Sequence, residues 1–266
     1  MLKRWWTTLR LWFRLFAFVV GTIFFWCCME VDFLLHRRTP RIDLINKWVP
    51  RWAKTLLWFF GIRVEARGPH ADQGEVFPGR DARGIGRIFI ANHQSGVDIP
   101  VLLSVIAAHA ISRHDLANWP LIGAGGRRIG TLFVDRDSRR SGATVLRQIA
   151  DALAAGEGIL MFPEGTAFPG IGVHEFKSGA FNAAHRSDAE IIPIGVAYGD
   201  PAAYYLKEPF LNHMKRIGSC RRLRVAVEFG TPLLPGAEGS LEMKDHARNV
   251  VESLVERAKQ RLQGEQ

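Results

Sequence analysis

The sequence contains few cysteines and no internal repeat. Its three cysteines, Cys27, Cys28 and Cys220, have neither the spacing of metal ligands nor that of a disulfide framework. His109 and His114 are not set with Asp or Glu in a ligand pattern either. These absences exclude a disulfide scaffold and a repeat protein, and they predict a chain without a bound metal. Its 266 residues suffice for one large core and an appendage.

The amino-terminal segment lacks an apolar run that is long enough by itself to cross a membrane. Leu15 to Met29 is uncharged over fifteen residues, whereas a spanning helix needs about twenty. The run reaches that length only if Leu11 to Phe13 join it and Arg14 extends toward the membrane surface. A signal peptide is the obvious alternative, but no small-residue cleavage site follows the run. A second apolar stretch, Trp48 to Phe60, lies beyond Thr39-Pro40.

Two arrangements of residues 1–60 stay open. They form either a two-helix hairpin, split at Thr39-Pro40, that dips into one leaflet, or one transmembrane helix with residues 41–60 packed on the remaining domain. The segment holds ten Lys and Arg against three Asp and Glu, and seven of the eight tryptophans. Cations mixed with aromatic residues are typical of proteins at anionic membrane surfaces. Because these cations flank an apolar block and not a nucleic-acid module, we expect no nucleic-acid partner.

From residue 62 onward, short apolar runs alternate with amphipathic stretches. The runs predict strands at 62–66, 87–91, 109–112, 130–134, 158–162, 190–197 and 223–229, and the stretches predict helices at 99–108, 138–155, 178–186 and 240–262. Residues 67–86 and 199–218 are interpreted as surface loops. Alternating strands and helices favour an α/β fold, with a mainly parallel sheet flanked by helices. We therefore expect a membrane-associated two-helix segment over 1–60 and a catalytic domain over 61–266.

Polar residues follow two of the predicted strands. Asn92-His93-Gln94-Ser95-Gly96-Val97-Asp98 comes after the first, and Phe162-Pro163-Glu164-Gly165-Thr166 closes another. Parallel sheets place their sites at the carboxyl ends of the strands, so we expect one shared pocket. A histidine oriented by a carboxylate can accept a proton from a hydroxyl near neutral pH. Ser95-x-x-Asp98 also matches a helix capping box, in which both side chains only satisfy backbone amides.

Four segments together resemble the glycerolipid acyltransferases of the lysophosphatidic acid acyltransferase family. His93 and Asp98 match the HxxxxD box of that family, and residues 162–166 match its FPEGT box. Gly130 to Arg136 is similar to the second box, and Ile191 to Val196 to the fourth. The ordered set covers about residues 87 to 198 and is far more specific than any one box alone.

The resemblance implies a reaction and a set of site residues. His93 would act as the general base on the acceptor hydroxyl, and Asp98 would orient it. Ser95 is interpreted as a capping residue, because it lacks the G-x-S-x-G setting of a hydrolase nucleophile. The residues expected to contact the acceptor are Arg136, Glu164, Gly165, Thr166 and Lys177. The acyl donor would be an acyl carrier protein or coenzyme A thioester, with no cofactor. We expect a protein of the inner membrane whose catalytic domain faces the cytoplasm.

Two positions depart from the family pattern. Ala167 stands where members that act on lysophosphatidic acid usually carry arginine, and Gly96 stands where many relatives have a bulky aromatic residue. The first departure leaves the acceptor open between 1-acylglycerol-3-phosphate and another lysolipid such as lyso-ornithine lipid. The second widens the mouth of the pocket or relaxes the turn. A thioesterase or lysolipid hydrolase on the same fold is the other alternative.

Overall fold

A seven-stranded sheet forms the centre of the protein over the residues that the computed structural model describes, 2–135, 139–168, 172–206, 208–236 and 239–264. Its order is β1-β7-β6-β2-β5-β3-β4, and neighbouring strands are parallel except β6 and β7. The strands are β1 Ile62–Arg67, β2 Ile88–Ala91, β3 His109–Arg113, β4 Leu132–Val134, β5 Ile159–Met161, β6 Ile191–Tyr198 and β7 Leu223–Phe229. The predicted mainly parallel sheet and all seven predicted strands are confirmed.

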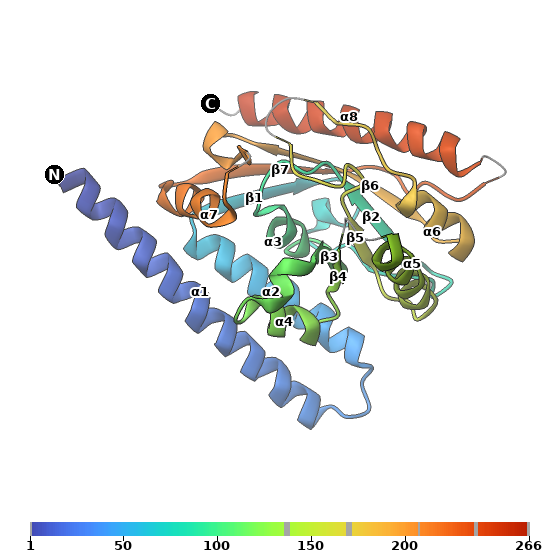
Figure 1. Cartoon of the computed structure of the whole chain (residues 1–266), viewed down its shortest axis with the longest axis horizontal. Helices are drawn as coiled ribbons and strands as arrows, with labels where there is room; N and C mark the ends of the chain where they lie inside the picture. The colour runs from blue at the N-terminus through green and yellow to red at the C-terminus, as the bar shows by residue number, and fades with distance from the viewer. Residues whose placement is uncertain (1, 136–138, 169–171, 207, 237–238, 265–266) are drawn as a thin grey trace.

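Helices cover both faces of this sheet (Figure 1). They are α1 Leu2–Leu35, α2 Arg41–Phe59, α3 Asp98–Leu103, α4 Ile122–Arg128, α5 Arg139–Ala154, α6 Gly179–Ser187, α7 Phe210–Ser219 and α8 Ser240–Gly264, with short 3₁₀ turns η1 Ala71–Gln73, η2 His114–Asn118 and η3 Pro201–Ala203. Side chains of β2 alternate between the two layers: Phe89 packs with residues of α2 and α3, whereas Ile88 and Ile90 pack with α5, α6 and α8. Buried apolar side chains on both faces explain why the strands form near-continuous hydrophobic runs.

The predicted helices are confirmed, although α3 ends at Leu103, earlier than expected. The prediction of a loop over 199–218 is wrong, because this segment contains η3 and helix α7. Phe210, Met214 and Ile217 recur at helical spacing and give α7 an apolar face, of which Ile217 is fully buried. The predicted loop 67–86 holds the short turn η1 and two isolated β-bridges, Phe77 with Ile106 and Arg80 with Gly86.

The amino-terminal segment forms two helices that are separated near Thr39-Pro40. The choice between the two predicted arrangements stays open. Among the described helices, α1 alone is long and apolar enough to cross a membrane. Helix α2 contributes Ile45, Val49 and Ala53 to the same core as the sheet. The expected domain boundary at residue 60 stays a prediction.

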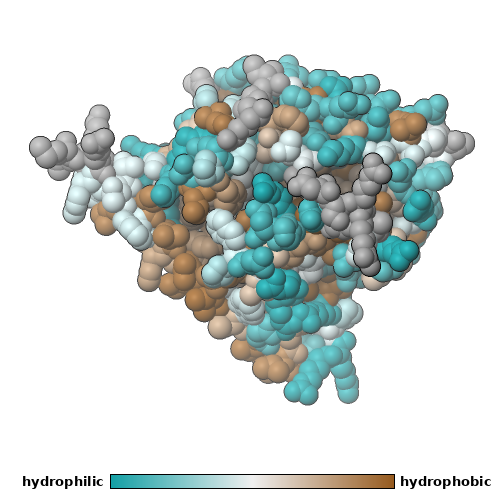
Figure 2. Space-filling view, viewed as in Figure 1, coloured by the Kyte–Doolittle hydropathy of each residue, from teal (hydrophilic) through white to brown (hydrophobic). Residues whose placement is uncertain are grey.

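Helix α1 contacts the rest of the protein along one side and exposes large apolar side chains on the other. Trp5, Trp12 and Phe16 are each about two-thirds exposed, at 64, 64 and 65%, and hydrophobic residues gather along the lower left of the molecule, where α1 runs (Figure 2). Arg14 does not extend toward a membrane surface. It is buried, and its guanidinium donates to the carbonyl oxygens of Phe59 at 3.2 Å and Gly218 at 2.9 Å. The first turns of α1 are therefore fixed to the ends of α2 and α7.

Candidate active site

His93 and Asp98 form a hydrogen-bonded pair at the carboxyl end of β2. His93 lies in the loop after the strand, and Asp98 is the first residue of α3. The Nδ1 atom of His93 lies 2.7 Å from Oδ2 of Asp98, which is fully buried. A carboxylate at this distance favours the tautomer with the proton on Nδ1. The Nε2 atom of His93 is then the nitrogen that can accept a proton.

Asp98 also satisfies the backbone of its own loop. Its Oδ2 atom accepts hydrogen bonds from the amides of Gln94 at 2.7 Å and Ser95 at 2.8 Å. Asp98 therefore contacts both His93 and the backbone amides, and its role as the acid that orients His93 in catalysis stays a prediction. Ser95 is not the cap of α3, because Val97 occupies that position without a side-chain cap bond. The hydroxyl of Ser95 accepts a hydrogen bond from the amide of Val97 at 3.4 Å and lies 3.3 Å from Nε2 of His213.

The FPEGT segment packs directly against the loop of His93. The ring of Phe162 stacks on the His93 imidazole, with 4.2 Å between centroids and 17° between planes. The amide of Phe168 donates to the carbonyl oxygen of His93 at 2.9 Å. The boxes at the ends of β2 and β5 thus meet, as the parallel pairing of these strands requires.

Glu164 is a buried carboxyl that joins two loops. Its oxygens accept hydrogen bonds from the amides of His93 at 3.4 Å and His174 at 3.3 Å, and the residue is 5% exposed. Burial, together with the smaller effect of the nearby Asp98, raises the pKa of Glu164 to about 7, against the effect of these two amides. In this arrangement Glu164 holds the His93 loop in place. Its predicted contact with the acceptor stays a prediction.

The remaining predicted acceptor contacts lie on or near the same turn. Gly165 has φ +79°, a backbone conformation that favours glycine, and a Cβ atom built there would lie 2.7 Å from Nζ of Lys177. The amide of Lys177 donates to the carbonyl oxygen of Pro163 at 2.9 Å, so Lys177 is held beside the turn. Thr166 follows with an exposed side chain. Arg136 lies outside the described residues.

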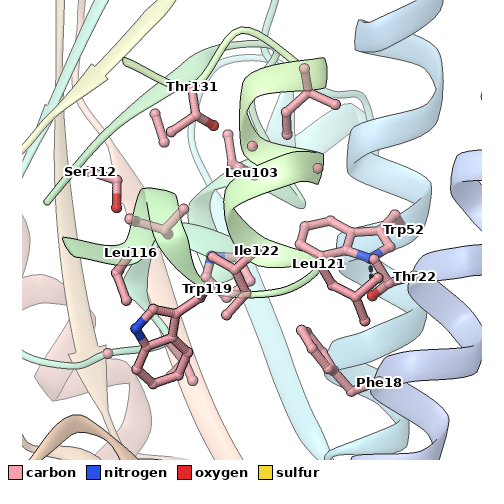
Figure 3. A pocket seen from close by; sticks show the side chains of 18 of the residues that line it. Phe18, Thr22, Trp52, Leu103, Ser112, Leu116, Trp119, Leu121, Ile122 and Thr131 are labelled. Carbon is pink, nitrogen blue, oxygen red and sulfur yellow. Dashed lines mark hydrogen bonds between the residues drawn. The ribbon is translucent and has the colours of Figure 1, made fainter. Parts of the chain in front are cut away.

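An apolar cavity of about 480 Å³ lies beside the His93 loop, at Gly96 and Val97. It extends between helices α1, α2, α3 and α4. Figure 3 shows Phe18 of α1, Trp52 of α2 and Ile122 of α4 among its lining side chains. A cavity of this size and character is typical of a site for an apolar ligand. No sequence pattern predicted it, because its walls come from segments far apart in the chain.

Two further residues beside the pair were not predicted from the sequence. Tyr198, the last residue of β6, donates its hydroxyl proton to Oδ1 of Asp98. His213 of α7 accepts a hydrogen bond from the amide of Gly96 at 2.9 Å. A tyrosine that ends an apolar strand has no signal that separates it from a core residue, and His213 lies in a segment that was interpreted as a loop.

Comparison with known proteins agrees with this geometry. A family model described as Acyltransferase matches residues 75–197. The chain is 31% identical over 190 residues to a 1-acyl-sn-glycerol-3-phosphate acyltransferase of Salmonella typhimurium, covering 70% of this chain and 72% of that protein. It is 34% identical over 167 residues to a lyso-ornithine lipid O-acyltransferase of Rhodobacter capsulatus, covering 58% of this chain and 60% of that protein. For several of the curated relatives, the chain spans only 50 to 60% of their length.

A solved structure shares the fold over almost the whole chain. The crystal structure of the 1-acyl-sn-glycerophosphate (LPA) acyltransferase PlsC from Thermotoga maritima superposes with a TM-score of 0.74 at 22% identity, covering 97% of this chain and 98% of that one. The chain belongs to the acyltransferase family that includes the 1-acyl-sn-glycerol-3-phosphate acyltransferases. The resemblance that the four boxes carry is thereby confirmed.

Proposed function

We propose that the protein is a membrane-associated O-acyltransferase that moves a fatty acyl group from an acyl thioester to the hydroxyl of a lysolipid. The observation that carries this proposal is the 2.7 Å contact between His93 Nδ1 and the buried carboxylate of Asp98, beside a cavity with apolar walls. The contact leaves Nε2 of His93 as the proton acceptor, and the cavity offers space for an acyl chain.

The reaction needs no covalent intermediate on the protein. His93 Nε2 accepts the proton of the acceptor hydroxyl while the oxygen attacks the thioester carbonyl carbon. A carbon–oxygen bond forms, the carbon–sulfur bond breaks, and the proton on His93 passes to the sulfur that leaves. Asp98 stabilises the imidazolium that forms in between. The donor is an acyl carrier protein or coenzyme A thioester, which serves as co-substrate.

The first acceptor to consider is 1-acylglycerol-3-phosphate, on which the Salmonella relative acts according to its name. Lyso-ornithine lipid is the second candidate, and Ala167 is the observation that favours it. An arginine at this position would supply a charge-assisted hydrogen bond to a phosphate, whereas alanine supplies none. The Rhodobacter relative carries the corresponding name. Lys177, whose Nζ lies beside Gly165, is a cation that could pair with the phosphate of one acceptor or the carboxylate of the other.

The attachment of α1 supports a position on one leaflet of the membrane. Arg14 is bound to the carbonyl oxygens of Phe59 and Gly218, and farther along α1 the carboxylate of Glu30 accepts hydrogen bonds from Arg128 of α4. Attachment at both places favours a helix that lies along the domain over one that crosses a bilayer. We infer that the exposed aromatic face of α1 enters one leaflet of the cytoplasmic membrane, with the domain on the cytoplasmic side.

A screen of acceptors by mass spectrometry tests this function. The purified full chain in detergent would receive palmitoyl-coenzyme A or palmitoyl-acyl carrier protein, with 1-acylglycerol-3-phosphate, lyso-ornithine lipid or no acceptor. We expect a diacyl product that depends on the acceptor, and we expect His93→Ala to reduce its formation at least a thousandfold while the protein stays folded. Free palmitate as the only product would identify a thioesterase. Near-normal transfer by His93→Ala would refute the mechanism.

A further inference from the structure

A chain of polar contacts continues from Asp98 on the side that does not face His93. Tyr198 donates its hydroxyl proton to Oδ1 of Asp98, and it also hydrogen-bonds the side chain of Ser95. Tyr198 is 6% exposed, and burial raises the pKa of its hydroxyl well above the usual value of 10. The phenol is therefore protonated at neutral pH and can donate to Asp98.

His213 continues the contact chain to α7. Its Nε2 atom accepts the amide proton of Gly96 at 2.9 Å and lies 3.3 Å from the hydroxyl of Ser95. The other ring nitrogen, Nδ1, lies 3.0 Å from a guanidinium nitrogen of Arg216 and 3.6 Å from Oε1 of Glu208. Burial and the adjacent Arg216 lower the pKa of His213 to about 4, so the imidazole is neutral. A neutral ring can keep this acceptor role at physiological pH.

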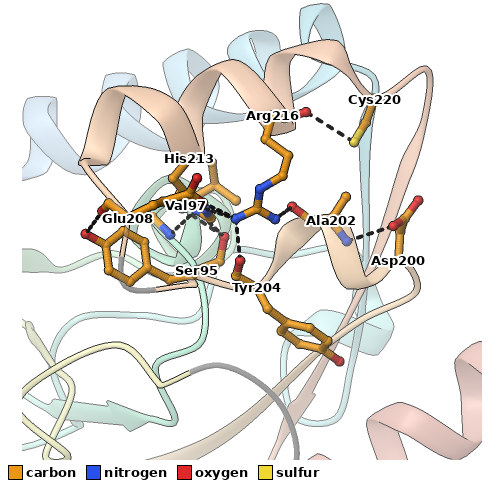
Figure 4. Close-up of polar contacts among 11 residues, drawn as sticks. Ser95, Val97, Asp200, Ala202, Tyr204, Glu208, His213, Arg216 and Cys220 are labelled. Atoms are coloured by element: carbon orange, nitrogen blue, oxygen red, sulfur yellow. Dashed lines mark hydrogen bonds and ion pairs between the residues drawn. The ribbon is translucent and has the colours of Figure 1, made fainter.

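Arg216 fixes the helix that carries His213. Its guanidinium donates to the carbonyl oxygens of Ala202 and Tyr204 and to the carboxylate of Glu208 (Figure 4). The segment between β6 and α7 is thereby tied to α7 itself. His213 is fully buried, and its position is set by a regular helix and not by a free loop.

The loop of His93 has no regular structure of its own between β2 and α3. Its contacts with β6 and α7 therefore supply much of what determines where His93 and Asp98 lie. Gly96 allows this arrangement, because a Cβ atom there would lie 2.8 Å from Cδ2 of His213 and 2.9 Å from Cε2 of Phe210. Side chains of α7 thus occupy the space that a larger residue at position 96 would need.

We propose that Tyr198 and His213 are positioning residues for acyl transfer: Tyr198 fixes the carboxylate of Asp98, and His213 fixes the loop that carries His93. This inference rests on the proposed function. Neither residue need touch a substrate, so its loss should lower turnover while substrate binding is preserved. A residue that only fills the core would change stability and leave turnover per folded molecule unaltered.

Four single variants of the full chain separate these roles. Tyr198→Phe removes the hydroxyl and keeps the ring, and His213→Leu removes the acceptor. His213→Gln retains an acceptor oxygen on a side chain that can reach Gly96. Tyr204→Phe is the matched control, because Tyr204 packs edge-on against Tyr198 at 6.4 Å between centroids and its ring points away from Ser95 and His213 (Figure 4).

Two readouts apply to each folded variant, steady-state kinetics and the NMR signal of the His93 Nδ1 proton. Kinetics use palmitoyl-coenzyme A with whichever of 1-acylglycerol-3-phosphate and lyso-ornithine lipid turns over faster. A strongly hydrogen-bonded imidazole proton resonates at low field, is observable without substrate, and is assigned by its loss in His93→Ala.

We expect Tyr198→Phe and His213→Leu to lower kcat about tenfold or more and to leave KM within about twofold of the parent. Tyr198→Phe loses a hydrogen bond to a carboxylate, and His213→Leu loses one to a buried amide. His213→Gln should recover most of kcat, and Tyr204→Phe should match the parent. The low-field signal should shift or broaden in the two impaired variants alone.

Several results would overturn the proposal. These are a kcat within twofold of the parent in folded Tyr198→Phe, a loss confined to KM, an equal loss in Tyr204→Phe, or an unchanged low-field signal. If His213→Leu does not fold, Tyr198→Phe decides the question. If the parent itself shows no turnover, the proposed function fails, and the NMR signal still tests whether Tyr198 and His213 position His93.

Discussion

Replacement of Glu164 by glutamine tests how strongly burial acts on a carboxyl beside His93. Glutamine keeps the shape of the side chain and removes its titration. Glu164 is 5% exposed and accepts hydrogen bonds from two backbone amides. The perturbation therefore changes one buried group and leaves the surrounding loops in place.

The magnitude follows from the pKa of Glu164, which burial raises from 4.5 to about 7. Between these values the folded protein retains a proton that the unfolded chain has already released. The free energy of unfolding contributed by this group is therefore largest below pH 4.5 and falls as the pH rises toward 7. The shift corresponds to a loss of about 3 kcal/mol by pH 8. The glutamine variant lacks this loss, so its stability relative to the parent should increase by about that amount between pH 4.5 and 8.

Urea unfolding followed by circular dichroism in a mild detergent would measure this difference at several pH values. At pH 5 the variant should be the less stable protein, because its amide N–H group faces one of the two backbone amides. At pH 8 it should equal or exceed the parent. Glu175→Gln is the matched control, since Glu175 is an exposed carboxylate nearby on the chain, and it should follow the parent at every pH. Parallel curves for parent and Glu164→Gln would show that the carboxyl is ionised throughout and refute the reasoning.

Two further substitutions test the contacts of α7 and α1. Gly96→Ala should displace α7, because the added Cβ atom would lie 2.8 Å from Cδ2 of His213. We expect the unfolding free energy to fall by about 1–3 kcal/mol and acyl transfer to slow at least tenfold. The control Gly239→Ala should change neither, because nothing lies within 4 Å of the Cβ atom that it adds. Arg14→Met should leave buried carbonyl oxygens without a donor, and urea unfolding should show a loss of about 2 kcal/mol or more in stability. Arg51 is exposed, so the control Arg51→Met should cost about 0.5 kcal/mol or less. Unchanged stability of Arg14→Met would contradict the attachment of α1 that its contacts describe.

The sheet could be predicted because each strand is a short apolar run that polar or glycine-rich residues interrupt. Burial on both faces produces such runs, as β6 shows with all of its residues buried. Helix α7 was missed although Phe210, Met214 and Ile217 have helical spacing. The preceding residues contain Gly199, two prolines and a charged pair, which is the composition of a loop, and the helix is only ten residues long.

The site was predictable in part, and for a different reason. The resemblance to the family singled out His93 and Asp98, and the parallel sheet then required Glu164 to lie near them. The partners of Asp98 beyond its own loop could not be predicted. Tyr198 and His213 approach from β6 and α7, at sequence separations of 100 and 118 residues from Asp98 and Ser95. Contacts at such separations depend on the order of strands in the sheet, which no local pattern encodes.

Gly96 illustrates how a departure from the family pattern acquires a physical meaning only in three dimensions. From the sequence, a glycine there widens the pocket or relaxes the turn. The structure does not require glycine for the turn, since Gly96 is not among the residues with positive φ. Nor does the glycine simply leave a wider mouth, because Phe210 and His213 fill the space beside it. The small residue is needed where α7 lies against the loop that carries His93, so position 96 and the residues of α7 that face it have to be considered as one unit. A larger side chain at position 96 should accordingly be tolerated only together with smaller residues at positions 210 and 213, and a double substitution can establish whether this coupling exists.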